Sequence, residues 1–252
     1  MSATERPIPV DVRAQLLAIG VPAHKHVPQA LEEMFPPELN IANAALNAED
    51  LARVLVHFAE RGLISTNHLG PRTSIRNVEP GWHSCLFYRD WRQLLQLTAP
   101  YIAEGLANGE GCLWVVPQAV APKTACDAIA RVVGDARPYL DSGQLEVLTH
   151  PNWYLDASGR LKTFEQIGAA LLDRQDRALA KGFKFLRAAG DTGWISGSQE
   201  SMDFIDYEVK INEALKPTKV AAVCTYRVDV TADELVAIVS AHQDALYTAP
   251  SM

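Results

Sequence analysis

From about residue 82 onward, short runs of apolar residues alternate with longer stretches in which apolar and polar positions follow helical spacing. The apolar runs predict buried strands at residues 83–88, 112–116, 144–149, 183–189 and 219–226. The longer stretches predict helices at residues 91–108, 123–133, 163–181, 198–215 and 232–241. Strands that are apolar throughout and alternate with helices indicate a parallel sheet that is covered on both faces. The predicted fold class is therefore α/β, a three-layer and mostly parallel sheet.

The first part of the chain has a different pattern and predicts a small, mainly helical module (residues 1–78) before the α/β domain (residues 79–252). Amphipathic stretches predict helices at residues 10–19, 28–34 and 48–61, with Asn47 as the N-cap of the third. A polar turn and an alternating, strand-like segment at residues 71–78 follow. This order is similar to the end of a winged-helix domain, in which the last hairpin lies along the DNA backbone.

The segment from residue 61 to residue 78 is locally basic, since it holds Arg61, Arg72, Arg76 and His68 and no acidic residue. We expect the three arginines to contact DNA phosphates. The whole chain has a net charge of −7, and residues 1–76 hold seven basic against eight acidic residues. This balance excludes an extended nucleic-acid-binding surface. It also supports the alternative that residues 1–78 form a helical cap for dimerisation or for a protein partner.

The composition is that of an ordinary globular protein, with 48% hydrophobic and 21% charged residues in 252. No apolar run is long enough to span a membrane, and the first residues lack the pattern of a signal peptide, so a cytoplasmic protein is expected. Cysteines are single and widely spaced, which argues against a disulfide framework or a zinc knuckle: Cys85, Cys112, Cys126 and Cys224.

Several separated motifs stand in order along the α/β region: HSCLFY at 83–88, PYIAEGLANGEGCLWVVP at 100–117, YLDSGQLEVLTHPNWYL at 139–155, GDTGWI at 190–195, YEVKINE at 207–213 and VAAVCTYRVD at 220–229. Together they resemble the MEDS family, the methanogen/methylotroph dichloromethane-regulator sensory domain. The resemblance implies a domain that senses simple hydrocarbon derivatives, often beside a DNA-binding or signalling module. It also implies a fold similar to P-loop ATPases of the RecA and circadian-clock type.

A P-loop itself is missing from this sequence. The strand at residues 83–88 runs into Arg89-Asp90-Trp91-Arg92, which has no glycine to bring backbone N–H groups around phosphates. The segments after residues 116 and 149 lack the motif as well. We therefore expect neither enzymatic activity nor a bound cofactor, because sharing a fold with ATPases does not transfer their chemistry.

The carboxyl ends of the predicted strands are rich in aromatic residues. In open α/β sheets ligands bind beyond these ends, so we expect a small organic ligand to contact a set of mostly aromatic and ionisable residues: Tyr88, Trp114, Trp153, Tyr154, Arg187, Asp191, Trp194, Glu208 and Tyr226. Trp153 and Trp194 are equally suited to anchoring loops on the sheet. Arg187 lies in an apolar strand and needs a carboxylate partner, which Asp191 or Glu208 would supply; a structural ion pair is the alternative to a ligand clamp.

His83, Cys85 and Cys224 form a second candidate group. His83 and Cys85 lie on one face of the first strand. The fifth strand, with Cys224, neighbours the first in RecA-like sheets, so the thiols would come close. Buried thiols and a hydrogen-bonded histidine are one interpretation. A redox or metal site is the other, because thiolate and imidazole suit zinc, copper or iron.

These observations support a one-component regulator that acts as a homodimer, in which the N-terminal module binds DNA according to ligand occupancy of the α/β domain. A sensor that acts through a protein partner, without DNA, is the second hypothesis. An enzyme is the third, although no nucleophile–base pair is recognisable in the sequence.

Overall fold

The computed structural model describes residues 45–60, 64–69, 75, 77–192 and 199–248. These residues form a seven-stranded sheet with the order β1-β7-β2-β6-β5-β3-β4, and all of its strand pairs are parallel. The strands are β1 (Ser65–His68), β2 (His83–Tyr88), β3 (Gly111–Val116), β4 (Leu145–Thr149), β5 (Leu186–Asp191), β6 (Val220–Arg227) and β7 (Asp244–Tyr247). The predicted parallel sheet is confirmed.

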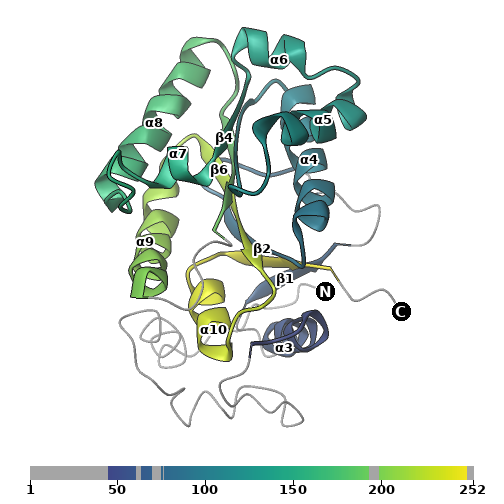
Figure 1. Cartoon of the computed structure of the whole chain (residues 1–252), viewed down its shortest axis with the longest axis vertical. Helices are drawn as coiled ribbons and strands as arrows, with labels where there is room; N and C mark the ends of the chain where they lie inside the picture. Colours follow the sequence, from purple (N-terminus) through teal and green to yellow (C-terminus); the bar gives the residue numbers. More distant parts are fainter. Residues whose placement is uncertain (1–44, 61–63, 70–74, 76, 193–198, 249–252) are drawn as a thin grey trace, which may run out of the picture.

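Helices cover both faces of this sheet (Figure 1). One face packs on α4 (Trp91–Ala107) and α5 (Pro122–Val133). The other face packs on α7 (His150–Tyr154), α8 (Phe164–Ala180) and α9 (Gln199–Leu215). Near β7, the same face packs on α3 (Ala48–Glu60) and α10 (Ala232–Ser240). A short helix, α6 (Arg137–Ser142), leads into β4. The predicted three-layer α/β class is confirmed. Among the described residues, no helix combines the length and apolar character needed to cross a bilayer.

The alternation of side chains along each strand decides which layer a residue joins. In β3, Trp114 packs in the core under α4, whereas Leu113 and Val115 pack in the core under α8 and α9. In β2, Leu86 packs in the core under α4. Its neighbours Cys85 and Phe87 pack in the core under α3 and α10. Two separate buried layers result, and a functional side chain belongs to one or the other.

The predicted elements of the α/β region agree closely with the structure, except for β5; the short elements α6, α7 and β7 were not predicted. β5 was expected at residues 183–189 but spans Leu186–Asp191. The residues before it complete the turn after α8, because the N–H groups of Phe183 and Lys184 donate to the carbonyls of Ala178 and Gly109. The turn at the end of α8 therefore uses apolar residues that look like the start of a strand.

The region before residue 78 departs from the predicted separate module. β1 pairs with β7 as the edge strand of the main sheet. Leu51, Leu55 and Phe58 of α3 belong to the same core as Phe87 of β2. The part of residues 1–78 that the structure describes therefore shares the core of the α/β domain, and no boundary at residue 78 separates the two.

The strand expected at residues 71–78 is absent from the described part of that segment. Ile75 and Val78 lie outside any strand and are buried in the core under α4. The predicted helices at residues 10–19 and 28–34, and the predicted DNA-contacting Arg61, Arg72 and Arg76, lie outside the described residues.

Candidate functional site

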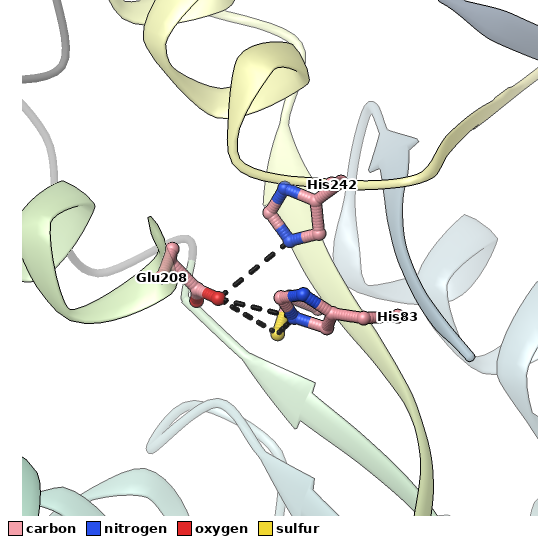
Figure 2. A group of neighbouring side chains, drawn as sticks. His83, Glu208 and His242 are labelled. Atoms are coloured by element: carbon pink, nitrogen blue, oxygen red, sulfur yellow. Dashed lines mark hydrogen bonds and ion pairs between the residues drawn. The ribbon is translucent and has the colours of Figure 1, made fainter. Parts of the chain in front are cut away.

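Four ionisable side chains meet in the layer beneath α9 and α10: His83, Glu208, Cys224 and His242 (Figure 2). All four are buried, and one potential ligand atom from each lies within 4.8 Å of all the others. Glu208 Oε2 is 3.2 Å from His83 Nε2, 3.5 Å from Cys224 Sγ and 3.6 Å from His242 Nε2. His83 Nε2 is 3.4 Å from Cys224 Sγ. A carboxylate oxygen thus stands against two imidazoles and a thiol.

Strand register and helix packing bring these four residues together. β2 and β6 pair so that His83 stands opposite Ala222, and Cys85 opposite Cys224. His83 and Cys224 therefore project from neighbouring strands on the same face of the sheet. Glu208 comes from α9 above that face, and His242 follows the end of α10 just before β7. His83 lies far along the chain from Glu208, Cys224 and His242, so the group forms only when the chain folds.

The tautomer of His242 follows from its hydrogen bond. Its Nδ1 is 2.7 Å from the carbonyl oxygen of Ile238. Since a carbonyl only accepts, Nδ1 carries the hydrogen. Burial, together with the neighbouring His83, lowers the pKa of His242 to about 3, so the ring is neutral near pH 7. Its Nε2 then carries a lone pair that faces Glu208 Oε2.

Glu208 and Cys224 differ in the direction of their pKa shifts. Burial works against a charged Glu208, but the hydrogen bonds from His83 and Cys224 leave the pKa of Glu208 lowered. Burial, and then the charge of Glu208, raise the pKa of the Cys224 thiol well above its ordinary value. Without a cation, the cluster therefore holds a carboxylate, a thiol and the neutral imidazole of His242.

Polar atoms of the cluster remain unsatisfied within the described part of the chain. His83 Nδ1, Glu208 Oε1 and His242 Nε2 are buried there without a hydrogen-bond partner. Buried polar atoms are nearly always paired, and each exception needs an explanation. This one cluster holds three of the seven buried side-chain nitrogen and oxygen atoms that lack a partner among the described residues.

An apolar cavity of about 40 Å³ adjoins the cluster. His83 and Cys224 form its polar wall, and its apolar and aromatic walls come from the sheet, α7, α8 and α9: Leu113, Val115, Trp153, Tyr154, Leu171, Ala188, Tyr207, Ile211 and Leu215. Gly190 lets Tyr154 approach the sheet, since a Cβ at this position would lie 2.6 Å from the Tyr154 hydroxyl oxygen. The cavity therefore combines aromatic walls with a polar end.

The predicted ligand-contacting aromatic residues do not form one crevice. Trp153 and Tyr154 line the cavity, but Trp114 is buried under α4 on the opposite face. Tyr88 donates its hydroxyl to Asp191 at 2.6 Å, at the carboxyl end of β5. Tyr226 packs against Phe87 and His242. Trp194 lies outside the described residues.

The predicted partners of Arg187 were wrong. Its guanidinium donates to both carboxylate oxygens of Glu110, at 2.5 and 3.1 Å, and not to Asp191 or Glu208. Arg187 lies at the amino end of β5 and faces α4, whereas Glu208 lies above the other face. Asp191 is four positions along the strand, or about 13 Å away. Arg187 is therefore part of a structural ion pair remote from the cavity.

The predicted redox or metal group is partly assembled. His83 and Cys224 come together as expected from neighbouring strands. Cys85 instead points its thiol at the carbonyl of Asp244 and belongs to the core of α3 and α10. Glu208, expected to bind the organic ligand, joins the cluster, and sequence reasoning missed His242 entirely. A lone histidine between a helix and an unrecognised short strand gives no local signal.

Comparisons with known proteins gave matches of two kinds, one by structure and one by family. No curated protein matches the chain. Among solved structures, a KaiC-like protein from the hyperthermophilic archaeon Pyrococcus horikoshii is similar at 13% identity and a TM-score of 0.38. That match covers 59% of this chain and 62% of the KaiC-like protein, less than two thirds of its length.

The sequence of the α/β domain gives the more informative match. Residues 82–243 match the family described as MEDS, the methanogen/methylotroph, DcmR sensory domain. The match spans β2 to His242 and so includes all four residues of the buried cluster. The chain belongs to the MEDS family of sensory domains.

Proposed function

We propose that this MEDS domain senses a small, mostly apolar organic molecule, which binds in the cavity beside His83 and Cys224. The cavity itself carries this proposal, because ligand sites are typically apolar and aromatic with a few convergent polar groups. An engineered cavity of about 150 Å³ takes up benzene. A cavity of about 40 Å³ suits a molecule of only a few non-hydrogen atoms.

The proposed output is control of DNA binding by a homodimer, through the basic segment of residues 61–78 that contains the edge strand β1. Support comes from the acid-free segment with Arg61, Arg72 and Arg76. The sheet also links the two regions: β2, which holds His83, pairs with β7, and β7 pairs with β1. A ligand that favours one of two arrangements at this sheet edge would change the position of the basic segment. The alternative output is a protein partner at the same segment.

We propose further that the domain is not an ATPase. The turn after β2 supports this, because the Asp90 carboxylate accepts the N–H groups of Arg92 and Gln93 at 2.8 and 3.0 Å. In a P-loop protein, backbone N–H groups at this type of position hold phosphate. A carboxylate that already occupies the helix terminus repels a phosphate group.

Ligand binding can be tested by tryptophan fluorescence with one- to three-carbon alcohols and haloalkanes as probes. At least one probe should change the wild-type emission saturably. Trp153→Phe should lose most of that change, while Trp114→Phe, on the other face, should keep it. Ala188→Leu fills the cavity and should abolish binding. If no probe gives a saturable change, or if Ala188→Leu binds normally, the cavity is not the ligand site.

The output can be tested by electrophoretic mobility shift with DNA from upstream of the gene, at several salt concentrations. A phosphate-contacting module should bind with an affinity that falls steeply with salt. Changing Arg72 and Arg76 to Ala should weaken binding to all sequences and reduce the salt slope by about one unit per lost contact. A wild-type protein without salt-dependent affinity for any DNA would favour the protein-partner output.

A further inference from the structure

The spacing of the four buried ligand atoms matches a metal coordination sphere. With zinc bonds of about 2.0–2.3 Å to nitrogen, oxygen and sulfur, tetrahedral ligand atoms stand about 3.3–3.8 Å apart. Four of the six separations, those that involve Glu208 Oε2 or join His83 Nε2 to Cys224 Sγ, run from 3.2 to 3.6 Å. The remaining two, from His242 Nε2 to His83 Nε2 and to Cys224 Sγ, are at most 4.8 Å. The four side chains therefore surround one point, and a small shift of the His242 ring would complete a tetrahedron.

The hydrogen bonds of the cluster leave electron pairs directed at one another. The Nδ1–H of His242 is held by the carbonyl of Ile238, so its Nε2 presents a lone pair 3.6 Å from Glu208 Oε2. Two acceptors that face each other in a buried site repel unless a proton or a cation lies between them. Metal-bound histidines commonly donate their second N–H to a backbone carbonyl in this way, which fixes the ring for coordination.

We propose that His83 Nε2, His242 Nε2, Cys224 Sγ and Glu208 Oε2 bind one divalent transition-metal ion. Two imidazoles, a thiolate and a carboxylate suit zinc or iron(II), and do not suit magnesium or calcium, which prefer oxygen ligands. Binding releases the Cys224 proton to solvent. The thiolate and carboxylate then balance the two charges of the ion, which leaves a neutral site in the core.

This metal site goes beyond the proposed sensing of an organic molecule and stands without it. His83 and Cys224 also line the apolar cavity, so the ion would lie at the polar end of that cavity. Metal binding is measurable with no organic ligand present. A failure of either proposal is thus distinguishable from a failure of the other.

Cobalt(II) is a suitable probe, because its tetrahedral complexes absorb in the visible and a thiolate ligand adds a charge-transfer band. The full-length protein is stripped with a chelator and titrated with Co²⁺ and then Zn²⁺. We expect one equivalent of Co²⁺ to give both features and Zn²⁺ to displace it. Absence of a stoichiometric tetrahedral spectrum would overturn the proposal.

Matched variants identify the ligands. Cys224→Ser should lose the charge-transfer band and weaken Co²⁺ binding by about 100-fold or more, since removing even an outer partner costs 10–100-fold. Cys85→Ser is the control: Cys85 stands opposite Cys224 in the sheet but outside the cluster, so the variant should keep the full spectrum. The reverse result would overturn the assignment.

A carboxylate variant keeps the test decisive if Cys224→Ser does not fold. Glu208→Gln is nearly isosteric and should retain the thiolate band but weaken Co²⁺ binding and lose metal-dependent thermal stabilisation. If instead Glu208→Gln binds Co²⁺ like the wild type, Glu208 is a structural partner of the histidines and the four-ligand site is wrong.

Discussion

The sheet separates two buried clusters of charged and polar groups that differ in how completely they are paired. Under α4, the Arg187 guanidinium binds both oxygens of Glu110, donates to the carbonyl of Tyr101 at 3.3 Å and lies 4.7 Å from the Tyr101 ring centre. Under α9 and α10, Glu208 shares one oxygen among two histidines and a thiol, and its second oxygen lacks a partner among the described residues. One cluster is complete without a ligand, and the other is not.

Burial of charge alone therefore does not mark a functional site. A bidentate Arg–Glu pair satisfies its own electrostatics, and its role is to fix α4 and the segment before β3 against the amino end of β5. The cluster around Glu208 leaves lone pairs and a carboxylate oxygen unsatisfied beside a cavity. Incomplete pairing beside a cavity is therefore the feature that distinguishes the proposed site from the Arg187–Glu110 pair.

The largest effect is expected from breaking the complete pair. Glu110→Ala leaves Arg187 charged and unpaired in the core and should lower the free energy of unfolding by about 3–5 kcal/mol. Urea unfolding followed by circular dichroism measures this. The double change Glu110→Leu with Arg187→Met should recover much of the loss, because replacing a whole buried pair by apolar residues is often neutral. A loss below about 1 kcal/mol for Glu110→Ala would mean that Arg187 does not depend on Glu110 to balance its charge.

Two glycines allow the rigidity of the clusters to be compared directly. A Cβ at Gly105 would lie 2.7 Å from Arg187 Cδ and Nε, and a Cβ at Gly190 would lie 2.6 Å from the Tyr154 hydroxyl oxygen. Arg187 is held by both oxygens of Glu110, whereas the atom nearest to a Cβ at Gly190 is the far end of the Tyr154 side chain, which borders the cavity. Gly105→Ala should therefore cost about 1–2 kcal/mol of unfolding free energy, even after the helix preference of alanine is counted, and Gly190→Ala less than about 1 kcal/mol.

The thermal unfolding temperatures of the two glycine variants, measured side by side without ligand, check this order. If Gly190→Ala were the more damaging change, the cavity side would be packed as tightly as the Arg187 side. The incompletely paired cluster would then be no easier to deform than the Arg187–Glu110 pair.

A smaller effect is expected from Glu208→Gln in metal-free protein. Glutamine keeps an acceptor for His83 and removes the buried carboxylate charge. The free energy of unfolding should change by less than about 1 kcal/mol, in contrast to Glu110→Ala. Denaturant unfolding in the presence of a chelator measures it. A loss as large as that of Glu110→Ala would show that Glu208 is an ion-pair partner of a protonated histidine.

The smallest effect concerns pH and His150, the first residue of α7. Burial lowers the pKa of His150, and its Nδ1 accepts the N–H of Gln118 at 3.1 Å, which requires the neutral ring. A folded pKa below the unfolded value of about 6.5 gives stability that is full above pH 6.5 and is lost as pH falls through the lowered pKa. His150→Asn keeps an acceptor for Gln118 but does not titrate. The variant should lose less stability than the wild type between neutral and mildly acidic pH, and equal losses would contradict the pKa shift.

The main elements of the α/β fold were predictable because each is specified locally. The apolar runs of β2, β3 and β6 and the helix of 91–108 are recognisable from neighbouring residues alone, and so is the cap at Thr231, whose hydroxyl accepts the N–H of Glu234. The pairing of β2 with β6, expected from the resemblance to RecA-like sheets, is confirmed. The four-residue strands β1 and β7 were missed, since so short a segment becomes a strand only by pairing with its neighbour.

Hydrophobic patterning predicted the layered α/β architecture, the motifs indicated the MEDS family, and the resemblance to RecA-like sheets placed His83 and Cys224 on adjacent strands. Which charges meet depends instead on the three-dimensional packing of the chain. Arg187 takes Glu110 because side-chain alternation turns it towards α4, and Glu208 meets His242 because the packing of α9 beside α10 brings together residues 34 positions apart. Hydrophobic periodicity is a property of neighbouring residues, whereas the partner of a buried charge depends on strand register and on which helix covers which face.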